Sequence, residues 1–298
     1  MDYYWTVPYL VPHIIAHSLS FTALLLGSMT DLRTREVPDW INYGLIASGV
    51  ALNLLFSIIY RTPYFILGSL AGLLIFFCIA YVMFYAGQWG GGDSKMLMGL
   101  GAVIGLEISL KSQHFLLAFL INTLLIGAIY GLLWSFYLVL RNRKRFWKEF
   151  IRILAAKKIA IAKKFILGMI ILILVALLFI NVLYIRLMVL SVAFLVLTSF
   201  YLWVFVKAIE KSCMHKLVEP SKLTEGDWIV KNIYVDGKFV TGPKDLGISK
   251  SKIRKLVEFY KKGKVRKILI KEGIPFVPSF LMAYIFTLIF GNAILMLL

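Results

Sequence analysis

The first 140 residues hold few carboxylates, and this scarcity makes each one a candidate for chemistry. Carboxylates beside apolar segments are energetically costly, so their presence there favours a functional role. Two carboxylates that approach closely cannot both ionise, and they therefore share one proton. One member of such a pair activates water as a general base while its protonated partner polarises a carbonyl group, without a metal or covalent intermediate. The candidates are Asp2, Asp31, Glu36, Asp39, Asp93 and Glu107.

Asp93 follows three consecutive glycines, Gly90, Gly91 and Gly92. Glycine adopts backbone angles that are closed to other residues, and it lets a substrate backbone approach closely. The alternative is a structural cap, because Asp is favoured at helix N-termini and glycine-rich turns often join spans. Lys95 either steers the electrostatics beside Asp93 or extends its ammonium group to the membrane interface. Both interpretations of this segment stay open.

The segment with Asp31 contains three acids, so position alone does not select a partner for Asp93. Asp31 is the acid nearest to the apolar run, and it either takes part in chemistry or simply ends a helix. Glu36 and Asp39 fall in an expected solvated turn, where Asp39 follows Pro38 and suits the start of the next helix.

The elements that must position these acids are membrane helices. Hydrophobic residues make up 60% of the 298 residues and charged residues 16%, with a mean hydropathy of +0.85. A globular chain has about half apolar and a quarter charged residues, and a helix needs roughly 20 apolar residues to cross the bilayer. The sequence predicts an all-α polytopic membrane protein with eight spans: 11–30, 40–59, 64–86, 94–110, 114–140, 165–185, 187–206 and 274–298.

Basic residues determine the predicted orientation. With the N-terminus outside, only Arg61, Lys111 and Arg186 of the 33 basic residues face the exterior. Such a bias is the positive-inside signal of a membrane protein. It predicts that both termini lie outside and that Asp31 and Asp93 both lie at the cytoplasmic face.

The net charge of +18 does not indicate nucleic-acid binding. The Lys and Arg residues are concentrated in connecting segments, as expected for cytoplasmic loops that face anionic lipid. Cys78 lies in an apolar run and Cys213 in a basic segment, so the sequence predicts neither a disulfide nor a metal site.

The segment 141–164 is either a basic amphipathic helix along the lipid headgroups or a solvated loop. The segment 207–273 contains alternating stretches around Asp236-Gly237 and a helical pattern at 249–262, which together predict a small α+β module. The predicted organisation is a membrane catalytic core at 1–140, the basic segment at 141–164, two spans at 165–206, a cytoplasmic module at 207–273 and a final helix at 274–298.

Two stretches, TDLRTREVPD at 30–39 and GGGDSKMLMGLGA at 90–102, resemble the signature regions of type IV prepilin peptidases. The resemblance is best to the archaeal preflagellin (prearchaellin) peptidase branch, which are membrane aspartyl proteases with a Gly-x-Gly-Asp motif. KEGIPFVP at 271–278 resembles the Ile-Pro-rich segment before the last helix of that family.

This resemblance implies that Asp31 and Asp93 are the catalytic pair and that no cofactor is required. It implies cleavage of a short basic leader from preflagellin or prepilin-like substrates, at the cytoplasmic face of an archaeal cell membrane. It also implies a core of six helices, to which the spans at 165–206 are an addition. Bacterial members carry a cytoplasmic domain with paired cysteines and methylate their product. This sequence lacks those cysteines, so methylation is not expected.

Two other functions are considered. A presenilin-like intramembrane protease also uses Gly-x-Gly-Asp, and such proteases combine this motif with a Tyr-Asp sequence and a Pro-Ala-Leu motif. In this sequence Thr30 precedes Asp31, and no Pro-Ala-Leu occurs. A proton-coupled transporter would use Asp31 and Asp93 as a relay and would show broken or charged span centres and an inverted repeat, and the sequence has neither. A structural scaffold would not explain two acids at one face.

Overall fold

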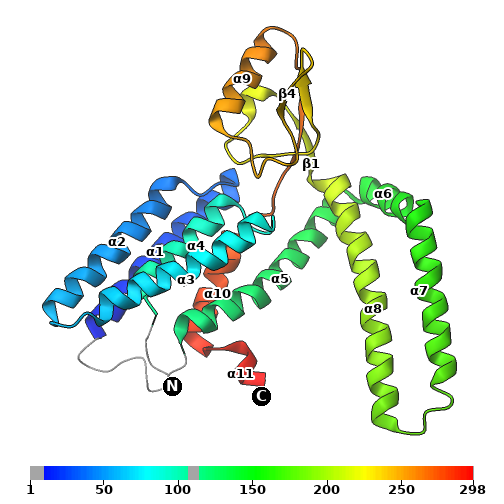
Figure 1. Ribbon diagram of the computed structural model, residues 1–298, viewed down its shortest axis with the longest axis horizontal. Coiled ribbons are helices and arrows are strands. Elements are labelled where there is room, and N and C mark those ends of the chain that lie inside the picture. The colour runs from blue at the N-terminus through cyan, green and yellow to red at the C-terminus, as the bar shows by residue number, and fades with distance from the viewer. Residues whose placement is uncertain (1–9, 107–113, 298) are drawn as a thin grey trace. The chain divides into compact units, whose positions relative to one another are not determined.

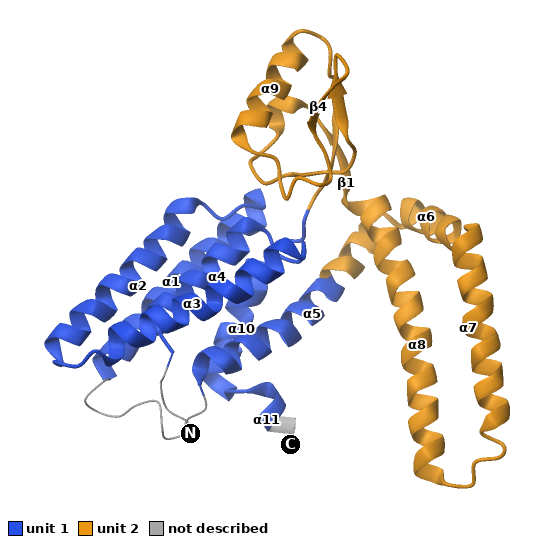
Figure 2. Cartoon of the chain, in the orientation of Figure 1, with its two compact units in different colours: residues 1–133, 273–298 blue, residues 134–272 orange. Residues whose placement is uncertain are grey.

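The computed structural model describes residues 10–106 and 114–297 of the chain (Figure 1). Asp2, Glu107, Lys111 and residues 107–110 of the fourth predicted span lie outside the described residues. The chain forms two compact units (Figure 2). Unit 1 combines residues 1–133 with 273–298, and unit 2 is residues 134–272.

The fold class is confirmed, because the protein is a helical multi-pass membrane protein with a small sheet-containing module. Among the described residues, six helices are long and apolar enough to cross a membrane. They are α1 (Leu10–Thr34), α2 (Asp39–Ile59), α3 (Tyr64–Tyr85), α5 (Phe115–Arg141), α7 (Lys157–Ala176) and α8 (Leu183–Ile209), which continues through a π-helical turn at Glu210–Met214.

Two of the eight predicted spans, 94–110 and 274–298, coincide with helices that are shorter than predicted within the described residues. α4 (Gly91–Ile104) and α10 (Val277–Phe290) have 14 residues each. At 1.5 Å per residue such helices reach about 21 Å, which is less than the hydrocarbon thickness. Gly105 (φ 72°) ends α4 and Gly291 (φ 71°) ends α10, although apolar residues follow both glycines. A short helix, α11 (Ala293–Leu297), follows α10.

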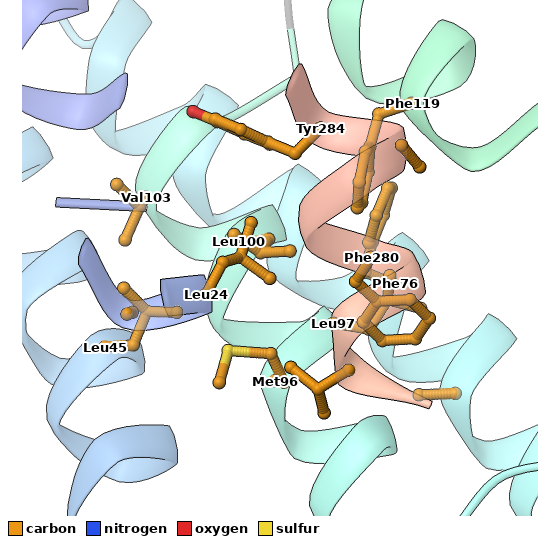
Figure 3. Packing of buried hydrophobic residues seen from close by; sticks show 14 of the residues in the cluster. Leu24, Leu45, Phe76, Met96, Leu97, Leu100, Val103, Phe119, Phe280 and Tyr284 are labelled. Carbon is orange, nitrogen blue, oxygen red and sulfur yellow. The ribbon is translucent and has the colours of Figure 1, made fainter. Parts of the chain in front are cut away.

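In unit 1, α4 is the central helix. It packs against α1, α2 and α3, and eight of its 14 residues are buried. Figure 3 shows Met96, Leu97 and Leu100 of α4 among side chains from the helices around it. A helix that is apolar on all sides is stable only when neighbours enclose it, which explains why a 14-residue helix is retained here.

Close backbone contacts hold α4 in place. A Cβ atom added at Gly72 of α3 would overlap the carbonyl oxygen of Gly101, and one added at Gly101 would lie 2.5 Å from the carbonyl oxygen of Gly72. A Cβ at Gly49 of α2 would lie 2.7 Å from the Val103 nitrogen. Small residues at helix crossings let backbones approach in this way.

Polar side chains satisfy the last carbonyl groups of α4, which have no partner within the helix. Asn53 Nδ2 of α2 donates to the carbonyl oxygens of Ala102 at 3.2 Å and Val103 at 3.0 Å. Ser69 Oγ of α3 donates to the Ala102 oxygen at 2.6 Å. On the other side of the unit, Asn122 Nδ2 of α5 donates to Thr287 Oγ1 at 2.9 Å and so fixes the end of α10.

In unit 2, the segment predicted at 141–164 is divided between two helices. α6 (Arg143–Ala155) ends at Ala156, whose extended angles (φ −61°, ψ 130°) separate it from α7. α6 buries Phe146 and Ile153 in a cluster with Val204 of α8. α7 has no buried residue, as expected for a helix surrounded by lipid.

The α+β module of unit 2 has a three-stranded antiparallel sheet in the order β1-β5-β2 and a separate hairpin of β3 and β4. The hairpin predicted around Asp236-Gly237 is present, and both residues have positive φ (51° and 75°), as a type I′ turn requires. The module consists of β1 (His215–Val218), β2 (Trp228–Ile229), β3 (Ile233–Val235), β4 (Lys238–Thr241), α9 (Lys250–Lys261) and β5 (Ile268–Lys271).

Candidate active site

Asp31 lies in the last turns of α1, and its side chain is buried with 5% exposure. Its Oδ2 atom accepts a hydrogen bond from the backbone N–H of Val277 at 3.0 Å, where α10 begins. A hydrogen bond from an N–H group stabilises a buried carboxylate that would otherwise lose its hydration. Asp31 therefore does more than end α1, because it joins the first and last parts of unit 1.

Asp93 is the third residue of α4, and its side chain is half-buried. Its Oδ2 atom accepts the backbone N–H of Gly90 at 2.9 Å, which fixes the turn that starts α4. The sequence offered Asp93 itself as the N-cap, whereas in the structure Gly90 is the N-cap and Asp93 reaches back to it from the third helical position, as in a capping box. This contact occupies one of the two carboxylate oxygens, so a capping role and a chemical role are compatible.

The two acids lie at the same end of unit 1. Gly27, one turn before Asp31, faces α4 so closely that an added Cβ would lie 2.6 Å from Met96 Cε and 3.4 Å from Val277 Cγ1. Met96 is in turn about one helical turn beyond Asp93. A Cβ added at Gly92, next to Asp93, would likewise lie 3.3 Å from Val37 in the turn after α1, so the structure brings together the two helix ends that carry the predicted residues.

Of the three glycines before Asp93, Gly90 and Gly92 lie close to neighbouring atoms, whereas Gly91 has room for a side chain. Gly90 has ordinary extended angles (φ −72°, ψ 167°), and Gly91 and Gly92 are not among the glycines with positive φ, so none of the three uses the left-handed angles that glycine allows. A Cβ at Gly92 would lie 3.3 Å from the Val37 Cβ. The glycine with positive φ in this turn is Gly87 (φ 67°), which follows α3 and which the sequence reasoning overlooked.

Lys95 contacts a different acid from the one expected. Its Nζ atom lies 2.6 Å from Asp39 Oδ1 and 4.9 Å from the centre of the Tyr43 ring, so it links α4 to the start of α2. The Asp39 side chain is 59% exposed, and such a pair contributes about 1 kcal/mol or less. Glu36 Oε1 is buried and has no hydrogen-bond partner among the described residues.

Sequence reasoning missed three further groups near the acids. They are the Val277 N–H, the ring of Trp89, which contacts Phe280, and Tyr130 of α5, which is near enough to Asp31 to interact electrostatically. The KEGIPFVP stretch indicated the region of Val277, and the hydroxyl group of a tyrosine within a long apolar run was a usable signal for Tyr130. Within residues 10–106 and 114–297, no group of three His, Cys, Asp or Glu side chains could hold a metal ion.

Unit 1 is thus a set of membrane helices with two carboxylates at one end, and comparisons with known proteins show which proteins it is similar to. The family described as "Type IV leader peptidase family" matches residues 18–132, which include Asp31 and Asp93. Residues 18–132 of the chain are similar to this family, and the resemblance noted in the sequence is confirmed.

Three curated relatives are preflagellin peptidases. The protein from Methanococcus voltae is 36% identical over 91 residues, which cover 30% of this chain and 39% of the relative. The protein from Methanococcus maripaludis is 29% identical over 161 residues, covering 50% and 70% of the two chains. The protein from Methanocaldococcus jannaschii is 36% identical over 81 residues, covering 27% and 34%. The matches with the first and third relatives thus cover less than half of those proteins.

Proposed function

We propose that this protein is a membrane aspartic endopeptidase that removes the leader peptide from preflagellin or prepilin-like substrates. The observation that carries the proposal is the placement of Asp31 and Asp93, from helices far apart in the chain, within electrostatic reach at one end of unit 1. The names of the three methanogen relatives supply the substrate class.

In the proposed mechanism, Asp31 and Asp93 share one proton and hold a water molecule between them. One carboxylate removes a proton from the water as it attacks the peptide carbonyl, and the other carboxyl donates its proton to the carbonyl oxygen. The tetrahedral intermediate collapses when a proton passes to the leaving amine, which breaks the carbon–nitrogen bond. The N–H groups of Val277 and Gly90 keep the two carboxylates oriented during these steps.

We place this site at the cytoplasmic face of the cell membrane, with both termini outside. The distribution of the 33 Lys and Arg residues favours this orientation. The apolar helix of the substrate would stay in the bilayer while its extended leader reaches the turn of Gly90–Gly92. The helices α7 and α8 and the module at 207–273 lie outside the matched residues 18–132, and we assign them no role in the cleavage itself.

The proposal is tested by mixing the detergent-solubilised protein with a preflagellin that carries its leader. The expected result is a shortened band whose N-terminal sequence begins after the leader. A preflagellin without its leader is the control and should keep its length. If the full-length substrate persists at every enzyme concentration, the proposed activity is wrong, and a transport role of the two acids becomes the better hypothesis.

Gly92→Ala is expected to lower the cleavage rate roughly 10-fold, because displacing a catalytic group by a fraction of an ångström weakens its alignment. The added methyl group would press on Val37 at 3.3 Å and shift the turn that carries Asp93. Gly91→Ala is the matched control, since its nearest neighbour would be Phe84 at 3.9 Å. Initial cleavage rates of the two variants test this prediction. Equal rates would contradict it and would show that the Asp93 turn tolerates the added methyl group of Gly92→Ala.

A further inference from the structure

Residues at the start of α10 contact groups that hold Asp31 and Asp93 in place. The backbone N–H of Val277 donates to Asp31 Oδ2 at 3.0 Å, and the Val277 side chain is fully buried. The N–H groups of a first helical turn have no partner within their helix. In α10 one of these groups is directed at an acid that the chain contributes 246 residues earlier.

The second contact runs through aromatic rings. Trp89 is 3% exposed, and its ring centre lies 5.4 Å from that of Phe280 in an edge-on arrangement and 6.3 Å from that of Phe276. Trp89 directly precedes Gly90, whose N–H holds Asp93. Movement of the α10 rings would therefore move the turn that orients Asp93.

The start of α10 is itself held firmly. A Cβ atom added at Gly127 of α5 would lie 2.6 Å from Phe276 Cζ, so the Phe276 ring sits directly against the α5 backbone. The rings of Phe276 and Phe280 also contact each other at 5.5 Å, nearly at right angles. Side chains enclosed in this way have little freedom to shift, because packed interiors leave few voids.

We propose that three residues at the start of α10 position the catalytic pair. The Val277 N–H orients Asp31, and Phe276 and Phe280 hold Trp89 and with it the Asp93 turn. This inference rests on the proposed peptidase function and extends it. Val277, Phe276, Phe280 and Trp89 are positioning residues, since they act on the substrate only through the two acids.

The sharpest test replaces the Val277 amide by an ester, through incorporation of the α-hydroxy acid analogue of valine in the full chain. The change removes one N–H group and keeps the side chain. Proline also lacks the N–H, but it is unsuitable because Phe276 has helical angles (φ −103°, ψ −24°), which a following proline disfavours. Because this N–H donates to Asp31 Oδ2, its loss should disturb the orientation of the acid rather than substrate binding, and we expect kcat to fall roughly 10- to 100-fold with an unchanged KM.

The matched control is the same ester substitution at Ser279, whose N–H donates to the Phe276 carbonyl oxygen at 2.9 Å in the same helical turn. It removes a backbone hydrogen bond without affecting Asp31, and its kcat should stay near that of the native chain. Equal losses of kcat in both ester variants would indicate a merely structural role of this turn and would overturn the proposal.

Trp89 provides an independent readout. Trp89→Leu is expected to lower kcat roughly 10-fold with KM unchanged, and Trp89→Phe should restore most of the rate, because it keeps a ring against Phe280. An unchanged kcat in the Val277 ester while the native chain cleaves preflagellin would overturn the positioning role and leave the proposed function intact. Failure of the native chain to cleave would instead remove the proposed function.

Discussion

Asp31→Asn and Asp93→Asn are each expected to reduce preflagellin cleavage by roughly 10³-fold or more, because an amide can neither accept the proton of the attacking water nor donate a carboxyl proton. Asparagine has nearly the same shape as aspartate, and its oxygen can still accept the N–H of Val277 or Gly90. Both variants should therefore accumulate in membranes like the native chain. Initial cleavage rates in isolated membranes, normalised to the amount of enzyme, measure the effect.

Two neighbouring acids provide the controls. Glu36→Gln and Asp39→Asn alter carboxylates in the same segment as Asp31, and both should keep much of the native activity. Asp39→Asn removes the negative charge that pairs with Lys95, and this exposed pair contributes about 1 kcal/mol or less. Cleavage at a native rate by either the Asp31 or the Asp93 variant would contradict the assignment of the catalytic pair.

The second large effect is expected at the crossing of α3 and α4. Gly72→Ala and Gly101→Ala should each destabilise unit 1 by about 3 kcal/mol, which is the upper range for overpacking a closely packed site. The added methyl groups would meet backbone atoms, Gly101 O and Gly72 O, which cannot rotate away as a side chain can. Because α4 carries Asp93, cleavage should be lost together with the fold. Unfolding in mixed micelles, followed by intrinsic fluorescence, measures the change.

Gly44→Ala in α2 is the control for this pair. An added Cβ there has nothing within 4 Å, so the same chemical change meets open space. The higher helix propensity of alanine should leave stability unchanged or raise it by about 1 kcal/mol. If Gly72→Ala proved as stable as Gly44→Ala, the close approach of α3 and α4 would be wrong.

The sequence predicted the membrane class and six of its helices because long apolar runs report directly on burial in lipid. It did not predict where α4 and α10 end, because hydropathy does not detect the glycines with positive φ at Gly105 and Gly291. The basic segment at 141–164 was interpreted as one element, since the turn at Ala156 has no proline or glycine to indicate it.

The candidate site, like the fold, was predicted only in part from the sequence. Asp31 and Asp93 were identified through the family resemblance, while physical reasoning alone left Glu36 and Asp39 as alternatives. The hydrogen bond from Val277 to Asp31 joins groups 246 residues apart and uses a backbone donor, so no side-chain pattern could indicate it. The contact of Lys95 with Asp39 was missed for the related reason that it depends on how α4 packs against α2.

The pairing of β1 with β5 has a consequence for protein engineering, because it determines how the α+β module could be removed or exchanged. The chain enters the module at His215 and leaves it at Lys271, and these two residues face each other across the antiparallel ladder. Partners in such a ladder have Cα atoms about 5 Å apart, a gap that one or two residues can bridge. A short linker could therefore replace the module, or another domain with neighbouring termini could be inserted in its place, without changing the spacing of the flanking chain.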